Sequence, residues 1–593
     1  MIVKVSDYVA SFLASHGVDT VFAISGGASL HLIHSVKSHK DLKLVCPHHE
    51  QGAAMAADGY ARLNKIMGVA IVTSGPGATN LITGICCSFY DSVPVLYITG
   101  QVSTFRSVGD SNVRQIGFQE TPIVEICNPI TKYAVCLKDP KKIRFELEKS
   151  FAFMTNGRPG PVILDIPDNL QREIIEEDEL IGFAGLGESS LRFSNINDAK
   201  NKIFAALAQA KRPVLIAGWG VHLAGVECQF QEFIESLEIP VAFTWASADL
   251  LNDEHPLSLG RFGTHGMRHT NFAVQNADLV ISLGSRLDTK ATGSPISSFA
   301  RDAKKIVVDI DPNELAKFEK FGLNIDLLVE CDLREFFSVF KPFDSTLTPC
   351  DTMAWLACIQ TWRDEFDKFD AVRLVSDGDV NPYRFFEILS DSADPNATIV
   401  VDTGCSIAWA MQTWRFKGTQ RLFHDYNNTA MGWALPASIG AWFANRRKGP
   451  LIFVVGDGSF MMYIQELATA RQHDIPLKII LINNSGYAMI KQTQDQWFDS
   501  QYFASCGNSD LLFPDFELVA RSFGFGYAYI GSDNNINFGL REVLNAPGPM
   551  LCEIKISQEA RVIPQVKYGR PNEDMEPLLP RKLFSKYMLI GMK

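Results

Sequence analysis

The sequence lacks a long hydrophobic run, a block of basic residues and a paired cysteine motif. No apolar stretch approaches the ~20 residues that a membrane-spanning helix needs, so we predict no contact with a membrane. The formal charge of −12 has no compensating basic block, which argues against nucleic acid as a partner. None of the 12 cysteines belongs to a CxxC pair, so we expect reduced thiols and no zinc site.

The amino terminus also lacks the features of a secretion signal. Residues 1–17 contain no charged n-region and no cleavage site, and they read as the first helix of a domain. We therefore expect a cytoplasmic protein. At 593 residues the chain is too long for one hydrophobic core, and its 46% hydrophobic and 21% charged residues are typical of ordinary globular domains.

Apolar, strand-like runs that end at glycine and lead into helix-like segments recur along the chain. This alternation predicts an α/β protein with three doubly wound parallel sheets. The predicted units are an N-terminal domain at 1–170, a central domain at 190–340, a C-terminal domain at 381–557 and a tail at 558–593. Residues 171–195 are predicted to be a surface linker, and residues 342–380 a connector with one helix near 355–369.

The most informative stretch is residues 454–487, where polar residues follow two strand-like runs. Asp457 lies in a Gly-Asp-Gly turn after the first run, and Asn484 follows the second, 27 residues later. Because parallel strands end at the same edge of a sheet, we expect these two side chains to lie side by side. A carboxylate, an amide oxygen and a nearby backbone carbonyl suit Mg²⁺, while the glycines and Ser459 suit a diphosphate. Taken alone, a Gly-Asp-Gly segment is more often an ordinary turn, but its spacing from Asn484 and the strand-like run before each favour the metal–diphosphate site.

A second informative stretch is HHEQGAAMAADGYAR at residues 48–62, which places Glu50 at the head of a helix rich in small residues. Glutamate in a first helical turn can simply cap the helix and meet its dipole favourably. Beside an apolar Ala/Met face, however, a carboxyl can stay protonated near neutral pH and act as an acid–base group. Both readings follow from the residue type.

Taken together, the motifs resemble those of the thiamine diphosphate-dependent decarboxylase and carboligase superfamily, and most closely those of acetolactate synthase catalytic subunits. The match runs from about residue 3 to 557. The segments that carry it, besides residues 48–62 and 454–487, are SGGAS at 25–29, TSGPGATN at 73–80, FQETPIV at 118–124, RPGPVILDIP at 158–167, FGTHG at 262–266 and AMGWALPASIGA at 430–441.

This resemblance implies a role for each residue at the cofactor. Glu50 matches the glutamate that hydrogen-bonds the aminopyrimidine ring and promotes formation of the ylide nucleophile. The implied Mg²⁺ ligands are Asp457, Asn484 and the carbonyl of Gly486. The residues implied to contact thiamine diphosphate are Cys405, Ser406, Thr429, Met431, Gly458, Ser459 and Met489. Without the resemblance, Met431 would read as filler of an apolar core.

The resemblance also implies a partner and a substrate class. In the family, Glu50 of one subunit faces the metal site of its neighbour, so we expect a homodimer or homotetramer. The implied substrates are small 2-oxo acids, and Gly27, Ala28, Phe118 and Gln119 match residues lining the reaction cleft. No sequence feature assigns a regulatory subunit.

The central unit resembles the part of acetolactate synthase that holds FAD in a structural role. The matching residues are Gly218, Gly220, Thr244, His265, Gly284, Arg286, Asp288, Asp309, Ile310 and Asp332. Glycine-ended strands, one arginine and several acids suit a dinucleotide. Many superfamily members keep this domain without a flavin, and the sequence contains no GxGxxG fingerprint, so both readings remain open.

The acceptor end departs from the acetolactate synthase pattern. Thr493 stands where those enzymes carry a tryptophan, and Lys290 replaces an arginine of the substrate channel. Cys405 and Ser406 stand where the family usually has Gln-His. The segment at 569–581 resembles relatives associated with surface-polysaccharide synthesis, in which the acceptor is a nucleotide-linked keto-sugar.

We therefore predict a thiamine diphosphate-dependent carboligase. It would decarboxylate pyruvate, or a similar 2-oxo acid, and transfer the acetyl unit to a 2-oxo acid or a keto-sugar nucleotide. The alternatives are a flavin-linked oxidase of the pyruvate oxidase type, a plain 2-oxo acid decarboxylase and a scaffold without activity. The presence of Glu50, Asp457 and Asn484 argues against the scaffold.

Overall fold

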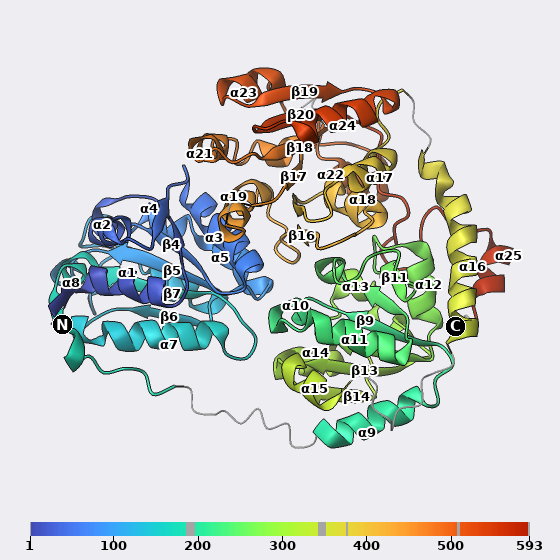
Figure 1. Cartoon of the computed structure of the whole chain (residues 1–593), viewed down its shortest axis with the longest axis horizontal. Helices are drawn as coiled ribbons and strands as arrows, with labels where there is room; N and C mark the ends of the chain where they lie inside the picture. The colour runs from blue at the N-terminus through green and yellow to red at the C-terminus, as the bar shows by residue number, and fades with distance from the viewer. Residues whose placement is uncertain are drawn as a thin grey trace.

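The computed structural model describes residues 2–185, 196–341, 352–374, 378–446, 448–506 and 510–590. In these ranges, three six-stranded sheets with only parallel strand pairs are covered by helices (Figure 1). This arrangement confirms the predicted α/β class. Strands such as β17 (Leu451–Gly456) are buried along their length, as expected for a parallel sheet with helices on both faces.

The N-terminal sheet has the strand order β3-β2-β4-β5-β7-β6. Its strands are β2 (Thr20–Ala23), β3 (Lys43–Val45), β4 (Gly68–Val72), β5 (Val95–Gln101), β6 (Tyr133–Cys136) and β7 (Val162–Pro167). Its helices are α1 (Val5–Ser15), α2 (Leu30–Ser38), α3 (Glu50–Asn64), α4 (Pro76–Thr79), α5 (Ile82–Tyr90), α6 (Ile123–Cys127), α7 (Ile143–Thr155) and α8 (Asp168–Gln171).

The C-terminal sheet repeats this topology, with the order β16-β15-β17-β18-β20-β19. Its strands are β15 (Thr398–Val401), β16 (Arg421–Phe423), β17, β18 (Lys478–Asn483), β19 (Gly526–Ile530) and β20 (Met550–Lys555). Its helices are α17 (Pro382–Ser392), α18 (Cys405–Thr413), α19 (Ala434–Ala444), α20 (Asp457–Phe460), α21 (Glu466–Gln472), α22 (Ala488–Trp497), α23 (Phe516–Ser522) and α24 (Ile536–Asn545). Counted within each sheet, both orders read 2-1-3-4-6-5.

The central sheet has a different order, β11-β10-β9-β12-β13-β14, which reads 3-2-1-4-5-6 when counted within the sheet. Its strands are β9 (Pro213–Ala217), β10 (Val241–Phe243), β11 (Ser258–Arg261), β12 (Leu279–Leu283), β13 (Lys304–Asp309) and β14 (Leu327–Glu330). Its helices are α9 (Ile196–Leu207), α10 (Gly220–Ala224), α11 (Glu227–Leu237), α12 (Arg268–Asn276), α13 (Thr289–Thr292), α14 (Pro312–Phe321) and α15 (Leu333–Val339). This is the strand order of dinucleotide-binding folds.

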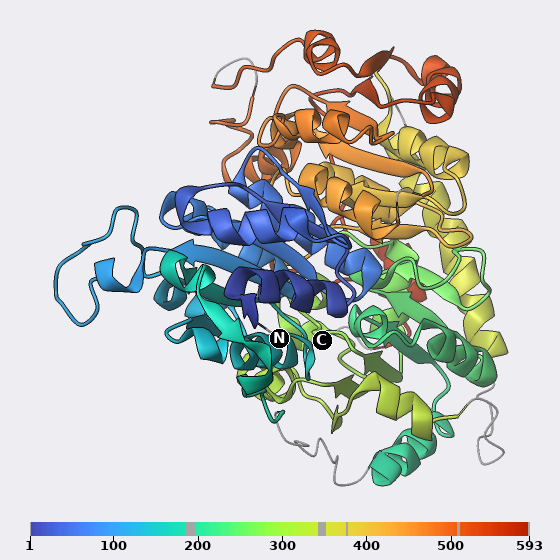
Figure 2. The same ribbon diagram turned by 60° about the vertical axis from the view of Figure 1, so that its left-hand side comes forward.

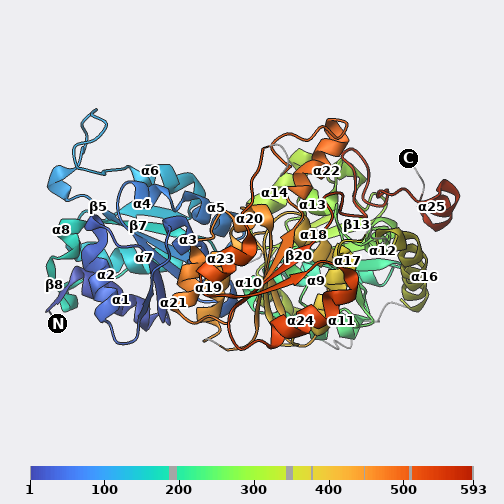
Figure 3. The ribbon, with the colours of Figure 1, turned by 90° about the horizontal axis from the view of Figure 1, so that it is seen from above.

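The N- and C-terminal domains of the chain are joined by α3 and α19, which lie side by side in Figures 1 and 3. A Cβ atom at Gly440 would lie 1.9 Å from the carbonyl oxygen of Ala56, and one at Gly59 would lie 2.3 Å from that of Ala437. Glycine is therefore required at both positions, because any side chain would push the helices apart. The contact continues into a shared core of alanines and aromatic residues.

The connector and the tail both pack against the central domain. Helix α16 (Met353–Asp370) matches the predicted connector helix and buries Trp355 and Trp362 against α12. The tail helix α25 (Arg581–Tyr587) adds Phe584 and Tyr587 to the same core. The sequence left open whether this tail covers an active site or a subunit contact. In this chain, residues 558–564 lie against α18 and α22 of the C-terminal domain, and the later part of the tail lies against the central domain.

The predicted linker at 171–195 is wrong for its first part. Strand β8 (Ile174–Glu176) pairs antiparallel with β1 (Ile2–Lys4), which ties this segment to the N-terminal domain. The strand was not recognisable within the acidic run, because only one of its three residues, Ile175, is buried. Residues 186–195 lie outside the described ranges. In those ranges, no helix combines the length and apolar character needed to cross a membrane.

Candidate active site

The predicted metal ligands meet at the carboxyl ends of β17 and β18, which are paired in parallel. Asp457 is buried and its Oδ2 accepts hydrogen bonds from the backbone N–H groups of Asn484 (3.1 Å) and Gly486 (3.2 Å). This contact confirms that the two turns lie side by side. Burial raises the pKa of Asp457 to about 7. A carboxylate, an amide and a carbonyl are hard oxygen ligands, and Mg²⁺ would favour the charged carboxylate here.

Gly458 is fixed by a close aromatic contact. A Cβ atom at this position would lie 2.0 Å from Cε1 of Tyr487. Its backbone N–H donates to Oδ1 of Asp457 at 2.7 Å. Gly458 and Ser459 lie in the first turn of α20, directly after β17, where backbone N–H groups have no partner within the helix.

A buried carboxylate that sequence reasoning missed, Asp402, holds the turn that carries Met431. It follows β15, and its side chain accepts hydrogen bonds from the N–H groups of Gly432 (3.1 Å) and Ala434 (2.9 Å). Thr429 has a φ of 53°, a left-handed conformation that is uncommon for a non-glycine residue. An acid directly after a strand-like run, as at Asp457, was the available signal. The predicted Cys405 and Ser406 open α18, three residues further along the chain.

The N-terminal half of the predicted site gathers around residues 73–80, which follow β4. Glu50 lies at the start of α3, and Nδ2 of Asn80 donates to its Oε2 at 2.9 Å. The N–H of Ala28 donates to Oγ1 of Thr73 at 3.2 Å, while a Cβ atom at Gly75 would lie 2.8 Å from Cβ of Gln119. Asn80 is the last residue of the TSGPGATN motif, but the sequence alone assigned no role to it.

The other two predicted cleft residues are open to solvent or free space. A Cβ atom at Gly27 would meet nothing within 4 Å, and the side chain of Phe118 is 86% exposed. Phe118 lies in the segment between β5 and α6, which extends away from the rest of the chain in Figure 2 (light blue). The carboxylate of Glu120 orders this segment by accepting hydrogen bonds from Val108, Ile116 and Gly117.

Glu466, from the C-terminal domain, fixes the start of α3. Its fully buried carboxylate accepts hydrogen bonds from the N–H of His48 (3.0 and 3.2 Å) and the hydroxyl of Thr469 (2.7 Å). A Cβ atom at Gly52 would lie 2.8 Å from Oε1 of Glu466, so glycine leaves room for this contact. Burial raises the pKa of Glu466. Sequence reasoning also missed this residue, because its partner is 418 residues away.

The two halves of the predicted site do not join within one chain. In the part of the chain that the structure describes, no hydrogen bond or ion pair connects Glu50 to Asp457, Asn484 or Gly486. The same-chain contacts between these domains include α3 with α19, Glu466 with His48, and Asp91 with Tyr426 and Asn427.

The predicted flavin-binding residues gather at the carboxyl ends of the central strands. The N–H of Gly220 donates to the carbonyl of Gly284 (3.0 Å), which joins the turns after β9 and β12 at the point where the strand order reverses. A cavity of about 300 Å³ opens there. Of the predicted residues, those lining it are Gly220, Gly284, Arg286, Asp309, Ile310 and Asp332.

A second cavity, of about 100 Å³, adjoins the first and is lined by the predicted Thr244, His265 and Asp288. The residues common to both cavities are Trp219, Gly284, Arg286 and Asn427. Gly218 lines neither, but a Cβ atom there would lie 2.3 Å from the carbonyl of Gly284. Two connected cavities with an arginine between them suit an elongated ligand that carries phosphates near its middle.

The charged groups of the central cavity already have partners in the protein. Arg286 pairs with Glu314 at 3.0 Å, and Asp332 pairs with Arg334. Burial raises the pKa of Asp309 to about 6, and burial together with Lys290 lowers the pKa of His265 to about 4. Ion pairs within the protein therefore hold Arg286 and Asp332 in place, and the imidazole of His265 is neutral.

The segment after the predicted metal ligands is buried on one face of α22 and exposed toward its end. On α22, the hydroxyl of Thr493 donates to the carbonyl of Met489 at 3.1 Å, and Met489 is half-buried. Trp497, four residues further on, is 66% exposed and fills no buried pocket of this chain. Lys290 lines the second cavity with its ammonium group 5.7 Å from the centroid of the Trp245 ring.

Comparison with known proteins identifies all three domains. Residues 3–123 match the model "Thiamine pyrophosphate enzyme, N-terminal TPP binding domain", residues 201–338 the central domain and residues 402–554 the C-terminal TPP binding domain. Acetolactate synthase 1 of Zea mays is 32% identical, over 96% of this chain and 88% of that protein. The acetolactate synthase large subunit of Lactococcus lactis is 31% identical, over 96% and 95%. That of Cyanidium caldarium is 32% identical, over 95% of each chain.

Proposed function

The chain belongs to the thiamine pyrophosphate-dependent enzymes as an acetolactate synthase-like carboligase, and we propose that its donor substrate is pyruvate. The observation that carries the cofactor assignment is the buried Asp457, which accepts hydrogen bonds from the backbone of Asn484 and Gly486 at the ends of two parallel strands. We propose that Asp457, Asn484 and the Gly486 carbonyl bind Mg²⁺, with Gly458 and Ser459 on the diphosphate.

The cofactor and the protein divide the chemistry. Thiamine diphosphate supplies, when bound, the carbon nucleophile and the electron sink for loss of CO₂ from a 2-oxo acid. Glu50 is the residue we propose to hydrogen-bond the aminopyrimidine ring and exchange a proton with it. Asn80 holds this carboxylate by donating to its Oε2, so that Glu50 keeps one orientation. The Thr429 carbonyl is proposed to accept a hydrogen bond from the exocyclic amine of the same ring. Met431 is proposed to support the bent cofactor, and Met489 to contact it.

A second copy of the chain is proposed to complete the site. Glu50 and the metal-binding turns of one chain are not joined by a hydrogen bond or ion pair in the described residues, which supports a homodimer with Glu50 of a second copy facing Asp457. The exposed segment with Phe118 and Gln119, together with Gly27 and Ala28, would then border the cleft where the 2-oxo acid binds. A homotetramer would pair two such dimers.

FAD is proposed as a structural ligand of the central domain. The strand order 3-2-1-4-5-6 and the cavity at its switch point support a dinucleotide. Arg286 would contact the phosphates, and Asp309 and Asp332 would accept hydrogen bonds from ribose hydroxyls. An oxidase, the alternative function, would need electrons to reach this flavin, and the acetolactate synthase relatives do not favour it.

The acceptor is proposed to be either a second 2-oxo acid or a larger keto compound such as a nucleotide-linked keto-sugar. Thr493 leaves more space on α22 than a tryptophan would, and Trp497 stays exposed. Mass spectrometry of products from pyruvate with 2-oxobutyrate or with keto-sugar nucleotides separates these acceptors. Hydrogen peroxide formation, or anaerobic flavin bleaching by pyruvate, would instead indicate the oxidase.

The role of Glu50 is tested by Glu50→Gln. We expect cofactor binding to persist while CO₂ release from pyruvate falls by about two orders of magnitude or more, within the range for loss of an acid–base group. Glu173→Gln, an exposed glutamate of the same domain, serves as control and should leave the rate unchanged. A wild-type rate in Glu50→Gln would refute the assignment.

A further inference from the structure

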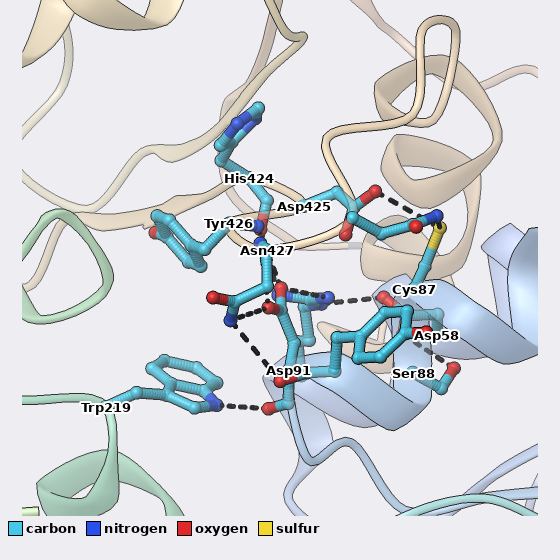
Figure 4. Close-up of polar contacts among 12 residues, drawn as sticks. Asp58, Cys87, Ser88, Asp91, Trp219, His424, Asp425, Tyr426 and Asn427 are labelled. Carbon is cyan, nitrogen blue, oxygen red and sulfur yellow. Dashed lines mark hydrogen bonds and ion pairs between the residues drawn. The ribbon is translucent and has the colours of Figure 1, made fainter. Parts of the chain in front are cut away.

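The three domains meet at a buried polar cluster that the proposed chemistry does not use (Figure 4). We call it the interdomain clamp, and its members are Asp58 and Arg62 of α3, Cys87 of α5, Asp91 just after α5 and Asp425 just after β16. All five are buried. Burying ionisable groups costs free energy, which their mutual ion pairs and hydrogen bonds must offset.

Arg62 contacts both ends of the segment 424–433, which carries Thr429 and Met431. Its guanidinium pairs with Asp58 (2.6 Å) and Asp91 (2.9 Å) and donates to the carbonyl of His424 (2.9 Å). At the other end of the segment, the same guanidinium lies 4.8 Å from the centroid of the Trp433 ring. A cation at this distance over a tryptophan ring is attracted to it.

Two carboxylates bind the backbone of the segment between these ends. Asp91, from the N-terminal domain, accepts hydrogen bonds from the N–H groups of Tyr426 (2.8 Å) and Asn427 (3.1 Å). Asp425 accepts one from the N–H of Ala430 (2.8 Å), which directly follows Thr429, and one from the thiol of Cys87 (3.1 Å). The N-terminal domain therefore binds the backbone before Thr429 directly, through Asp91. It reaches the backbone after Thr429 indirectly, through the contact of Cys87 with Asp425.

The charges of the clamp do not balance, because three carboxyl groups share one guanidinium. Burial and the neighbouring Asp91 carboxylate raise the pKa of Asp425 to about 7. The central domain also reaches the clamp, since Nε1 of Trp219 donates to the backbone carbonyl of Asp91 at 3.0 Å. Trp219 lies between Gly218 and Gly220 in the wall of the central cavity.

We propose that the interdomain clamp positions Thr429 and Met431 for thiamine diphosphate, with Arg62, Asp91 and Asp425 as positioning residues. The inference rests on the proposed cofactor contacts of Thr429 and Met431. A purely structural role would give a different result: loss of the clamp would lower stability and leave the affinity of the folded protein for the cofactor unchanged.

The test compares Asp91→Asn with Asp370→Asn as the matched control. Asp370 of α16 is also a buried partner of an arginine, Arg268 of the central domain, at 2.8 Å. The same arginine donates to the carbonyl of Met575 in the tail. The dissociation constant of thiamine diphosphate is measured from tryptophan fluorescence in saturating Mg²⁺, and thermal unfolding is measured without cofactor. We expect Asp91→Asn to raise the dissociation constant about tenfold, and Asp370→Asn to lower the melting temperature with at most about a twofold effect on binding.

A pair of milder variants keeps the test decisive if Asp91→Asn does not fold. Cys87→Ala removes the donor to Asp425 and should raise the dissociation constant about threefold or more, while Cys87→Ser restores a donor and should recover most of the affinity. Wild-type binding in Cys87→Ala, or no recovery in Cys87→Ser, would overturn the clamp, as would wild-type binding in a folded Asp91→Asn. A wild-type protein that fails to bind thiamine diphosphate would contradict the proposed function itself.

Discussion

The C-terminal and central domains both present glycine turns at the carboxyl ends of parallel strands, but they do so in different ways. In the C-terminal domain, Asp457 is bound by backbone N–H groups, and its proposed partners lie on adjacent strands. In the central domain, Arg286 forms an ion pair with Glu314, and Asp332 forms one with Arg334. The cavity there lies where the strand order reverses.

This difference explains why one site is visible in a short motif and the other is not. A site built from backbone groups requires particular residues, as the 2.0 Å clash at Gly458 illustrates. A site built from side-chain pairs along several strands tolerates many residue types, so its strongest signal is the topology. We therefore expect substitutions in the C-terminal site to be more damaging than substitutions in the central cavity.

The largest effect is expected from Asp457→Ala. Without this carboxylate the proposed Mg²⁺ site would lose its charged ligand and the turns at Asn484 and Gly486 would lose their acceptor, so Mg²⁺-dependent retention of thiamine diphosphate should be lost. Equilibrium dialysis with radiolabelled cofactor measures this. Flavin content should not change, because the central cavity is a separate site. The control is Asp474→Ala, whose side chain is 83% exposed. Unchanged cofactor affinity in Asp457→Ala would exclude the metal assignment.

The effect of the central cavity on FAD binding is tested by Arg286→Gln. Because Arg286 already pairs with Glu314, its loss should weaken FAD binding by about tenfold rather than abolish it, with no change in thiamine diphosphate affinity. Flavin fluorescence titration measures the change. Arg521→Gln removes a comparable Arg–Glu pair from the surface helix α23 and should leave both affinities unchanged. Loss of thiamine diphosphate binding in Arg286→Gln would show that the two sites are not independent.

Glu466→Gln is expected to have a smaller effect, because it changes the N-terminal half without touching either cofactor site. The amide would place a donor against the N–H of His48 and shift the start of α3, where Glu50 lies. We expect kcat to fall about threefold to tenfold while the dissociation constant of thiamine diphosphate stays within about twofold. Glu517→Gln, on the surface of α23, is the control. The opposite pattern, a weaker affinity with a normal kcat, would contradict this role.

The sequence predicted those parts of the molecule that depend on local patterns. Strand-like runs ending at glycine gave the three parallel sheets, and the pairing of Asp457 with the turn at Asn484 followed from strand topology. The connector helix was also predicted, because residues 342–380 contain no strand-like run. Each of these features depends on residues that are close in sequence or on a rule for neighbouring strands.

The features that the sequence missed depend on contacts between distant segments. Glu466 meets His48 across 418 residues, and Asp91 meets Tyr426 across 335. Neither acid belongs to a distinctive local pattern, and only the fold brings it to its partner. Strand β8 was missed for a related reason, since three residues with one buried side chain give no periodic signal.

The smallest expected effect concerns Asp309 in the wall of the central cavity. Its pKa is raised to about 6 in the folded protein by burial, against about 3.9 in an unfolded chain. Between these values the folded state binds more protons, so Asp309 lowers stability progressively as the pH rises through this range.

Asp309→Asn lacks this dependence and keeps an oxygen to accept from the N–H of Asp311. From pH 5 to pH 8, the variant without ligand should gain roughly 1 kcal/mol over wild type, measured as a growing difference in melting temperature. Asp302→Asn, at an exposed position in the same domain, should show no such trend. A difference that does not change with pH would mean that water solvates the Asp309 carboxylate in the cavity. The central site would then resemble the exposed end of α22 more than the buried turn at Asp457.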